Sequence, residues 1–370
     1  MKALGIYAGI GAMLIAFQRS GWEVLANIED RKIHTFEDDF GDNTFTYNFD
    51  APLLPVIDSL EIAHNGIDLV AAQPKCGGFS QLFGTGRKPT DAKSAQQNYG
   101  KNILTTIKWI NRIDSRFFYF ENLPKSLLLI TPEMWKELLP GYDLQFEWVS
   151  NYGYGNPQKG RDRLYVIGSN KDEDFLFIPR EIKHGTTVKD RIGDLVTKLG
   201  MVANHDIHSF SDTDNITNLS KSNQWRDIAE FVLTLKGGEN LPYKAKDGNI
   251  KRRIGSNLLY WDKHSHTLAG IKGAKFHPLN GYPISIRERC RLQGYPDDFI
   301  IKGTHYNSDG TWTLRKNSNV VRQLNNTIPY EFTKEFARQL NHYIKTGDLV
   351  EEQAIRSLKP NPIIERARSL

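Results

Sequence analysis

The stretch AAQPKCGGFSQ, at residues 71–81, contains Cys76, one of only two cysteines in this chain of 370 residues. A free cysteine is normally buried among apolar residues, whereas Cys76 lies between Lys75 and the glycines Gly77 and Gly78. A neighbouring ammonium group favours the thiolate, which is the nucleophilic form of cysteine. The segment therefore predicts a reactive thiol, with a small buried core residue as the alternative interpretation.

Two further segments carry groups that could assist such a thiol. Glu121 and Asn122 close the apolar run RFFYFEN, and a carboxyl group at the end of an apolar strand tends to have the raised pKa that a proton donor needs. Arg161 and Arg163 stand two residues apart in NPQKGRDRLYVIG, so an extended chain would place both on one face, where they suit a phosphate or a ring carbonyl. The alternative interpretations are a helix-capping acid and a pair of solvated charges.

The amino-terminal segment has the outline of a nucleotide-binding unit. Residues 2–8 form a short apolar strand, the glycines of GIG turn the chain into a helix, and residues 22–30 form a second strand that ends in Glu29 and Asp30. Glycines let the backbone approach a ligand, and an acid at the end of the next strand can bind a ribose. A tight packing turn explains this pattern equally well when it is taken alone.

These groups can act together only if a sheet brings them to one edge. Strand-like and helix-like segments alternate along the first half of the chain, which predicts an α/β fold with a doubly wound mixed or parallel sheet. In such folds ligands bind at the carboxyl ends of the strands. The further predicted strands are residues 67–73, 116–122, 144–150 and 163–169, and the predicted helices include residues 100–113 and 328–344.

Composition and charge exclude several classes of protein. Hydrophobic residues make up 39% and charged residues 25% of the chain, which is typical of a globular protein with one large domain and a smaller one. The net charge of +5 tolerates a polyanionic partner. The apolar start carries three glycines and no small-residue cleavage site, so we expect no secretory signal and no membrane span. We expect a monomeric cytoplasmic protein of a bacterial or phage-infected cell, without a metal.

Six blocks in order resemble the motifs of the cytosine-C5 DNA methyltransferases. YAGIG is similar to that family's F-A-G-x-G, QPKCGGFS to P-P-C-Q-x-F-S, ENLP to E-N-V, and PQKGRDR to Q-x-R-x-R. IRERCRLQGYPDDF is similar to R-E-x-x-R-L-Q-G-F-P-D-x-F, and RQLNNTIP to Q-x-G-N-S-V-P. The resemblance runs through most of the chain. It implies a Rossmann-like, class I S-adenosylmethionine-dependent methyltransferase with a smaller, irregular target-recognition domain.

The resemblance also implies a mechanism. Carbon 5 of cytosine is too weak a nucleophile to take a methyl group, but addition of a thiolate at carbon 6 converts the ring into a reactive enamine. Cys76 would be that thiolate, Glu121 would bind and protonate ring nitrogen 3, and Arg163, helped by Arg161, would hold the carbonyl at position 2. The cytosine would be flipped out of double-stranded DNA. S-adenosylmethionine would supply the methyl group.

The same matching assigns residues to the cofactor, to DNA and to domains. Glu29 would bind the ribose, Asp30 would lie near the adenine, and Asp50 would bind the adenine amino group, while the loop from Ser80 to about Gly100 would close over the site. The expected cofactor-binding residues are Tyr7, Ala8, Gly9, Gly11, Glu29, Asp30, Asp50, Pro74, Lys75 and Asn326, and the expected DNA-binding residues are Ser80, Arg87, Lys251, Arg252 and Arg253. The expected domains are a catalytic and cofactor-binding domain at 1–173, a target-recognition domain at 174–278, a return to the catalytic domain at 279–345 and a tail at 346–370.

The chain departs from the family pattern at several positions. Gly5 stands where the family usually has an acid, Asn325 replaces a glycine, and Gly160 is an extra residue. Lys75 replaces the proline before the nucleophile, and Gly77 replaces the glutamine after it.

Lys75 leaves three interpretations open, because an ammonium facing the sulfonium of S-adenosylmethionine in a dry site is unfavourable. Its side chain would contact DNA phosphates, activate Cys76, or complement an anionic donor such as carboxy-S-adenosylmethionine, so that a carboxymethyl group is transferred. A tRNA cytosine-C5 methyltransferase, a nicotinamide-dependent oxidoreductase and an inactive DNA-binding relative are the remaining alternatives.

Overall fold

The computed structural model describes residues 1–29, 44–46, 66–76, 79, 89–177, 186–196, 231–244, 249–268, 275–281, 283–299, 301 and 324–350. Within these ranges, side chains are described except at 44–46, 89–99, 242–244 and 250–256. The chain divides into two compact units. Unit 1 comprises Met1–Ser150, Asp162–Arg180 and Phe332–Leu370, and unit 2 comprises Asn151–Arg161 and Glu181–Glu331.

Unit 1 is built on a seven-stranded sheet with the order β3-β2-β1-β4-β5-β8-β6. The first five strands in this order are parallel, and β8 runs antiparallel to both of its neighbours. The sheet is therefore mixed. The strands are β1 (Lys2–Ile6), β2 (Glu23–Glu29), β3 (Thr44–Thr46), β4 (Leu69–Ala72), β5 (Phe117–Asn122), β6 (Tyr142–Ser150) and β8 (Asp162–Asn170).

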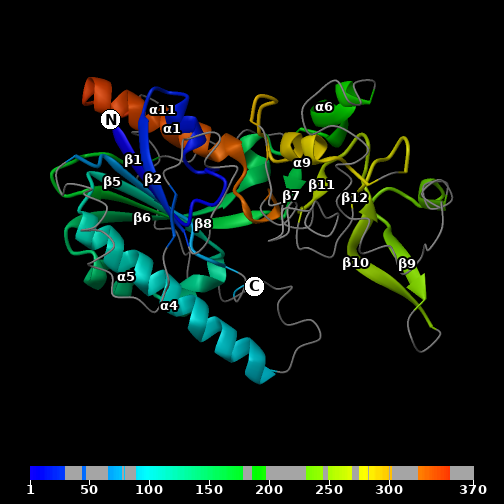
Figure 1. The fold of residues 1–370 in the computed structure, drawn as a ribbon, viewed down its shortest axis with the longest axis horizontal. Coiled ribbons are helices and arrows are strands. Elements are labelled where there is room, and N and C mark those ends of the chain that lie inside the picture. Colours follow the sequence, from blue (N-terminus) through cyan, green and yellow to red (C-terminus); the bar gives the residue numbers. More distant parts are fainter. Residues whose placement is uncertain are drawn as a thin grey trace, which may run out of the picture. The chain divides into compact units, whose positions relative to one another are not determined.

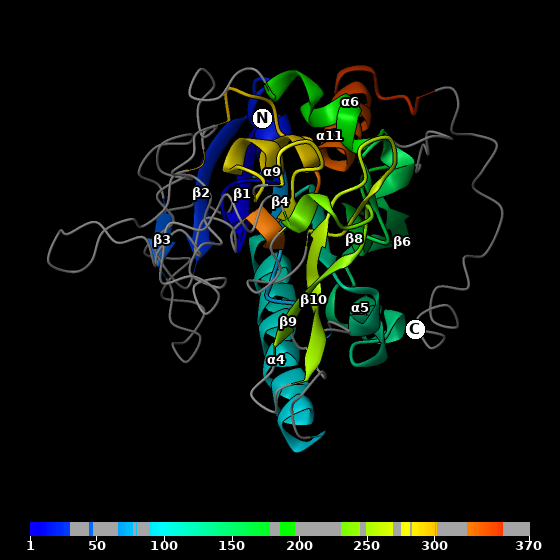
Figure 2. The same ribbon diagram turned by 90° about the vertical axis from the view of Figure 1, so that its right-hand side faces the viewer.

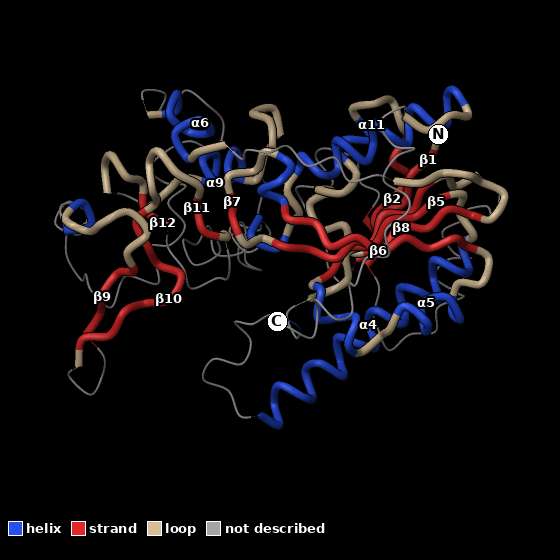
Figure 3. Tube along the Cα trace, turned by 180° about the vertical axis from the view of Figure 1, so that it is seen from behind, coloured by secondary structure: helices blue, strands red, loops and turns tan. Residues whose placement is uncertain are grey.

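Helices cover both faces of this sheet, as a doubly wound fold requires (Figure 1). Figure 3 shows the same layers from behind, with α11 (Tyr330–Thr346) on one side of the strands and α4 (Pro89–Ile113) and α5 (Pro132–Leu138) on the other. The short helix α1 (Ile15–Gln18) lies with α11 (Figure 1). The prediction of an α/β fold with a doubly wound mixed sheet is confirmed.

Successive side chains of β5 point to opposite faces of the sheet, so this apolar strand packs against the helices on both sides. All six of its residues are buried, as expected of a central strand covered on both faces. Phe118 and Phe120 pack against Trp135 of α5, while Tyr119 packs against Phe336 of α11. The strand therefore carries no exposed face, and its first polar side chains occur where it ends.

One prediction about the segment after Cys76 is wrong. The sequence predicts a loop from Ser80 to about Gly100, but α4 begins at Pro89 and continues without interruption to Ile113. Residues 80–88 of that loop lie outside the described residues. Proline is favoured in the first turn of a helix because it has no amide hydrogen to leave unpaired. The residues that follow include alanine, lysine and glutamine, which are strong helix formers despite the polar composition.

Unit 2 contains short elements and two small cores. Strands β12-β10-β9 form one sheet and β11-β7 another, and β9 and β10 lie side by side as an antiparallel pair (Figure 2). The elements are η4 (Asn151–Tyr154), β7 (Gln158–Lys159), α6 (Val188–Ile192), η5 (Gly193–Leu195), β9 (Asn240–Lys244), β10 (Ile250–Leu258), β11 (Ser265–His266), β12 (Lys275–Phe276) and α9 (Ile286–Leu292). Unit 2 includes residues 279–331, because α9 packs against α6. The assignment of 279–345 to the catalytic domain therefore stays a prediction.

The described residues offer neither a helix suited to a membrane nor a cluster suited to a metal ion. None of the helices in these ranges combines the length and the apolar character needed to cross a bilayer. Among the same residues, no group of three or more histidine, cysteine, aspartate or glutamate side chains could hold a metal ion.

Candidate active site

The strand order creates the place where a ligand would bind. The chain moves outward from β1 to β2 and β3 and then returns to β4 on the other side of β1. Such a reversal leaves a crevice between the carboxyl ends of the two central strands. Ile6 pairs with both Ile28 and Ala72, so the segments that follow β1, β2 and β4 leave the sheet at one edge. The glycine turn, Glu29 and the Cys76 segment are thus brought to the same edge.

The glycine turn has the backbone conformation that its sequence suggests. Gly9 and Gly11 have φ angles of 58° and 82°, which favour glycine, and Tyr7 has a φ of 56°, which is uncommon for a residue with a side chain. The amide of Gly9 donates to the Glu29 carboxylate at 2.6 Å. In the described part of the chain, a Cβ placed on Gly9 would meet no atom within 4 Å, so the backbone here faces open space. A glycine backbone beside a buried acid fits a nucleotide cofactor with a ribose.

Asn27 of β2 contacts this turn and was missed by sequence reasoning. It is fully buried in β2, and its Oδ1 accepts from the Ala8 amide at 3.1 Å. Its Nδ2 donates to the Gly9 carbonyl at 3.2 Å. The available signal was an amide side chain within the otherwise apolar run VLANI.

The segment around Cys76 is held by backbone contacts and by Asn122. Cys76 is partly buried, the Phe79 amide donates to its carbonyl at 3.0 Å, and Lys75 is exposed. Asn122 donates from Nδ2 to the Pro74 carbonyl at 3.2 Å. The strand-end asparagine, noted in the sequence but given no role, therefore ties the end of β5 to the segment that carries the thiol.

The other cysteine offers a contrast. Cys290 is fully buried in α9, and burial raises the pKa of its thiol to about 12. A thiol that stays protonated at neutral pH is a poor nucleophile. Of the two, only Cys76 lies partly accessible at the ligand-binding edge of the sheet.

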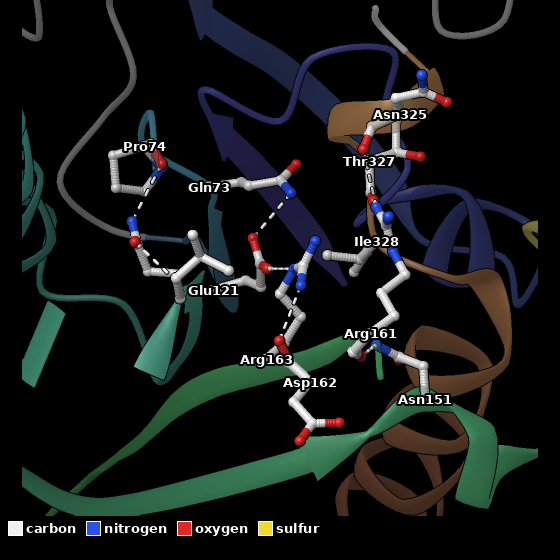
Figure 4. A network of polar contacts seen from close by, with 12 residues as sticks. Gln73, Pro74, Glu121, Asn151, Arg161, Asp162, Arg163, Asn325, Thr327 and Ile328 are labelled. Atoms are coloured by element: carbon white, nitrogen blue, oxygen red, sulfur yellow. Dashed lines mark hydrogen bonds and ion pairs between the residues drawn. The ribbon is translucent and has the colours of Figure 1, made fainter. Parts of the chain in front are cut away.

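Glu121 and Arg163 form a buried ion pair at this edge (Figure 4). β8 runs antiparallel to β5 and pairs Glu121 with Tyr165, so the beginning of β8 lies at the carboxyl end of β5. Arg163 Nε is 2.8 Å from Glu121 Oε1, and only 1% of the Glu121 side chain is exposed. The guanidinium offsets the negative charge of the carboxylate whenever Glu121 has given up its proton, in a place where an unpaired charge would be costly.

Gln73 is a third member of this group and a second residue that sequence reasoning missed. Its Nε2 donates to Glu121 Oε2 at 2.8 Å (Figure 4). Each carboxylate oxygen of Glu121 therefore faces a nitrogen of its own, Arg163 on one side and Gln73 on the other. The sequence offered no signal, since Gln73 falls within the AAQPKC segment without any known partner.

Arg161 and Arg163 have different environments although they are two residues apart. Arg161 is fully buried within unit 2 and donates to the backbone carbonyls of Leu268, Asn325 and Thr327. Figure 4 shows Arg161 with Asn325 and Thr327. The structure thus gives its guanidinium a scaffolding role in the loops of unit 2. The predicted help of Arg161 in holding the base stays a prediction.

Two other motif blocks meet within unit 2. Gln158 donates from Nε2 to the Leu292 carbonyl and to Gln293 Oε1, and its own Oε1 accepts from the Leu268 amide. The PQ and RLQG blocks therefore share hydrogen bonds that hold the backbone of this unit. Asn326, from the RQLNNTIP block, is exposed.

Several predicted residues fall outside the described part of the chain. Asp30, Asp50, Ser80 and Arg87 lie outside the described residues. For Lys251, Arg252 and Arg253 the structure describes the backbone, which forms part of β10, and not the side chains. Their roles stay predictions.

The sheet, its covering helices and the order of its strands define an α/β methyltransferase fold. A crystal structure assigned as a DNA modification methyltransferase from an E. coli prophage shares this fold, with a TM-score of 0.66 and 20% identity over 93% of this chain and 99% of the other. The chain belongs to the family of C-5 cytosine-specific DNA methylases, whose model matches residues 1–342. The resemblance inferred from the sequence blocks is confirmed.

Curated relatives match over similar lengths. The type II methyltransferase M.FnuDI of Fusobacterium nucleatum is 25% identical over 379 residues, which cover 95% of this chain and 98% of the relative. The type II methyltransferase M1.HphI of Haemophilus parahaemolyticus is 23% identical over 314 residues, covering 81% and 79%. This chain is therefore a DNA cytosine-5 methyltransferase by family, and enzymes of this family use S-adenosylmethionine.

Proposed function

We propose that this protein transfers a methyl group from S-adenosylmethionine to carbon 5 of cytosine in double-stranded DNA, through a covalent adduct with Cys76. The observation that carries the proposal is the buried Arg163–Glu121 ion pair at the sheet edge that also carries the Cys76 segment. Addition to a pyrimidine ring requires a nucleophile and a carboxyl group that acts on the ring nitrogen, and the strands that carry Cys76 and Glu121 end at the same edge of the sheet.

The chemistry assigns one task to each of these groups. The Cys76 sulfur forms a bond to carbon 6 while ring nitrogen 3 takes a proton held by Glu121, which leaves an enamine with electron density on carbon 5. Arg163 holds the carbonyl at position 2 and keeps Glu121 in place. S-adenosylmethionine, when bound, supplies the methyl group as a sulfonium. A base then removes the proton from carbon 5. Breaking of the sulfur–carbon bond frees Cys76, and return of the nitrogen 3 proton to Glu121 restores neutral, aromatic 5-methylcytosine.

The cofactor would lie against the glycine turn. Gly9 and Gly11 would line its methionine end, and Glu29 would bind the ribose, with further contacts from Tyr7, Ala8, Pro74, Lys75 and Asn326. The open space beside Gly9 and the nearby carboxylate of Glu29 support this assignment. Asp30 and Asp50 are proposed for the adenine.

DNA would approach with its target base unstacked, because carbon 6 of a stacked and paired cytosine is out of reach of a thiolate held in a protein pocket. Ser80, Arg87 and the basic run Lys251–Arg253 are proposed to contact the DNA, the basic side chains through its phosphates. The exposure of Lys75 supports the interpretation that its ammonium also serves phosphates.

The test is covalent trapping on fluorinated DNA. With S-adenosylmethionine present, methyl transfer leaves a fluorine at carbon 5 that cannot be removed as a proton, so the sulfur–carbon bond cannot be broken by elimination. The wild-type protein should therefore remain bound to 5-fluorocytosine duplexes through denaturing electrophoresis. Cys76→Ser should abolish both trapping and methylation, while Cys290→Ala, which changes the buried thiol, should retain trapping. Trapping that survives in Cys76→Ser would overturn the assignment of the nucleophile.

Mass spectrometry of nucleosides separates the alternatives. Duplex DNA and tRNA are each incubated with S-adenosylmethionine and carboxy-S-adenosylmethionine together. The proposal expects 5-methylcytosine in DNA alone. A carboxymethylated base would establish the larger anionic donor that Lys75 could complement, and modified tRNA would establish an RNA substrate.

A further inference from the structure

Asn27 is a polar residue in a place that normally excludes one. It lies in β2 with no exposed surface, and an amide buried without hydrogen bonds costs several kcal/mol. Its Oδ1 accepts from the Ala8 amide, and its Nδ2 donates to the Gly9 carbonyl at 3.2 Å and reaches Glu29 Oε1 at 3.4 Å. The side chain thus spans the glycine turn and the acid at the end of its own strand.

Gly5 provides the room for this side chain. Gly5 is the register partner of Asn27 in the parallel β1–β2 pair. A Cβ on Gly5 would lie 2.8 Å from Asn27 Oδ1, and 3.0 Å from both Ala8 Cβ and Leu14 Cδ1. Since real Cβ atoms essentially never approach a heavy atom so closely, the two positions are coupled: an Asn27 side chain in this rotamer needs a glycine opposite it.

The turn needs such support because its backbone is strained. Tyr7 has a φ of 56°, which costs energy for a residue with a Cβ, and Gly9 also has a positive φ. Asn27 binds the amide that directly follows Tyr7 and the carbonyl of Gly9, while Glu29 accepts the Gly9 amide. Three backbone polar groups of the turn, the amides of Ala8 and Gly9 and the carbonyl of Gly9, are therefore held by side chains of β2.

We propose that Asn27 positions the glycine turn that would bind the cofactor. Gly5 and Asn27 are coupled in this role, because the absence of a side chain at position 5 leaves room for the amide at position 27. This inference rests on the proposed cofactor site. It explains the departure at Gly5, because the polar group beside the turn comes from the neighbouring strand and not from β1.

The first test compares cofactor binding and hydrogen exchange of the turn in the wild type and in Asn27→Ala. Asn27→Ala leaves the buried Ala8 amide without its acceptor, so the Kd for S-adenosylhomocysteine should rise at least tenfold in calorimetry. The KM for S-adenosylmethionine should rise while the KM for DNA stays within twofold. In the cofactor-free protein, hydrogen exchange of residues 7–14 should be faster. The control is Ser115→Ala, which removes the buried hydrogen bond that the Ser115 hydroxyl donates to the carbonyl of Phe117, the first residue of β5.

The second test is a double-mutant cycle in the cofactor-free protein. Gly5→Ala should lower the Tm by several degrees in the wild type and by clearly less in the Asn27→Ala background, because the closest clash is removed. Equal losses in both backgrounds, or unchanged exchange of residues 7–14 in Asn27→Ala, would overturn the inference. If the wild type binds no S-adenosylhomocysteine, the proposed function fails, while the exchange data and the cycle still decide the role of Asn27.

Discussion

Replacing Gln73 with leucine tests whether the orientation of Glu121 matters for catalysis. Gln73 Nε2 donates to Glu121 Oε2 at 2.8 Å, and the carboxylate is almost completely buried. Gln73→Leu keeps a side chain of similar length but removes this donor. A hydrogen bond to a charged group contributes about 1.5–3 kcal/mol. If that free energy is fully expressed in the step that protonates the ring, kcat should fall about 10- to 150-fold.

The assay is single-turnover methylation of unmethylated plasmid DNA, with cofactor and DNA both saturating. Saturation separates the chemical step from binding, so the loss should appear in the rate constant and not in the KM for DNA. The backbone amide of Gln73, which donates to the Ile6 carbonyl, is unaffected by the substitution. The Kd for S-adenosylhomocysteine should therefore stay within about twofold.

A matched control comes from the sheet itself. Gln145 donates from Nε2 to Glu147 Oε1 at 2.7 Å along β6, so Gln145→Leu also removes a glutamine–glutamate hydrogen bond. That variant should lower stability and leave the single-turnover rate nearly unchanged. A Gln73→Leu enzyme with a wild-type rate, or an equal loss of rate in Gln145→Leu, would refute the reasoning.

Two further predictions concern stability. Gly168→Ala should destabilise unit 1 by about 3 kcal/mol or more in urea unfolding, because its Cβ would lie 2.0 Å from Phe118 Cε1, while Gly141→Ala, whose Cβ meets nothing within 4 Å, should change stability by less than about 1 kcal/mol. Burial raises the pKa of Glu288 to about 7 from an ordinary value of 4.5. The folded chain therefore keeps a proton that the unfolded chain releases, and stability should fall by on the order of 3 kcal/mol as pH rises between these values. Glu288→Gln should flatten that slope in unfolding at pH 5 and pH 8, and an unchanged slope would contradict the assignment.

The strands around the site were predictable because their signals are local. The apolar runs at β1, β4 and β5 are short, buried on both faces and closed by polar residues, so both the strands and the edge they share follow from the sequence. Cys76 and Glu121 could be placed at that edge for the same reason. The directions in which β8 and β6 run could not be predicted, since an extended segment has the same side-chain period whichever way it runs.

The contacts within the site were less predictable because they join distant positions. Asn27 and Gly5 form a pair only in the register of two parallel strands, and Gln73 meets Glu121 only across β4 and β5. Arg161 looked like a partner of Arg163 by spacing, yet it donates to carbonyls far along the chain. Sequence spacing predicts which strand end a residue occupies, whereas side-chain partners are set by tertiary packing.

The membership of Asn151–Arg161 in unit 2 has a consequence for engineering hybrid enzymes. A graft that exchanges only residues 181–331 with those of a relative would surround the native Arg161 with foreign carbonyl groups, although this guanidinium is held by the backbone of Leu268, Asn325 and Thr327. A buried arginine without hydrogen-bond acceptors would destabilise the hybrid protein, so that a change in its DNA recognition sequence could not be measured. Exchanges that transplant both pieces together keep that anchorage intact.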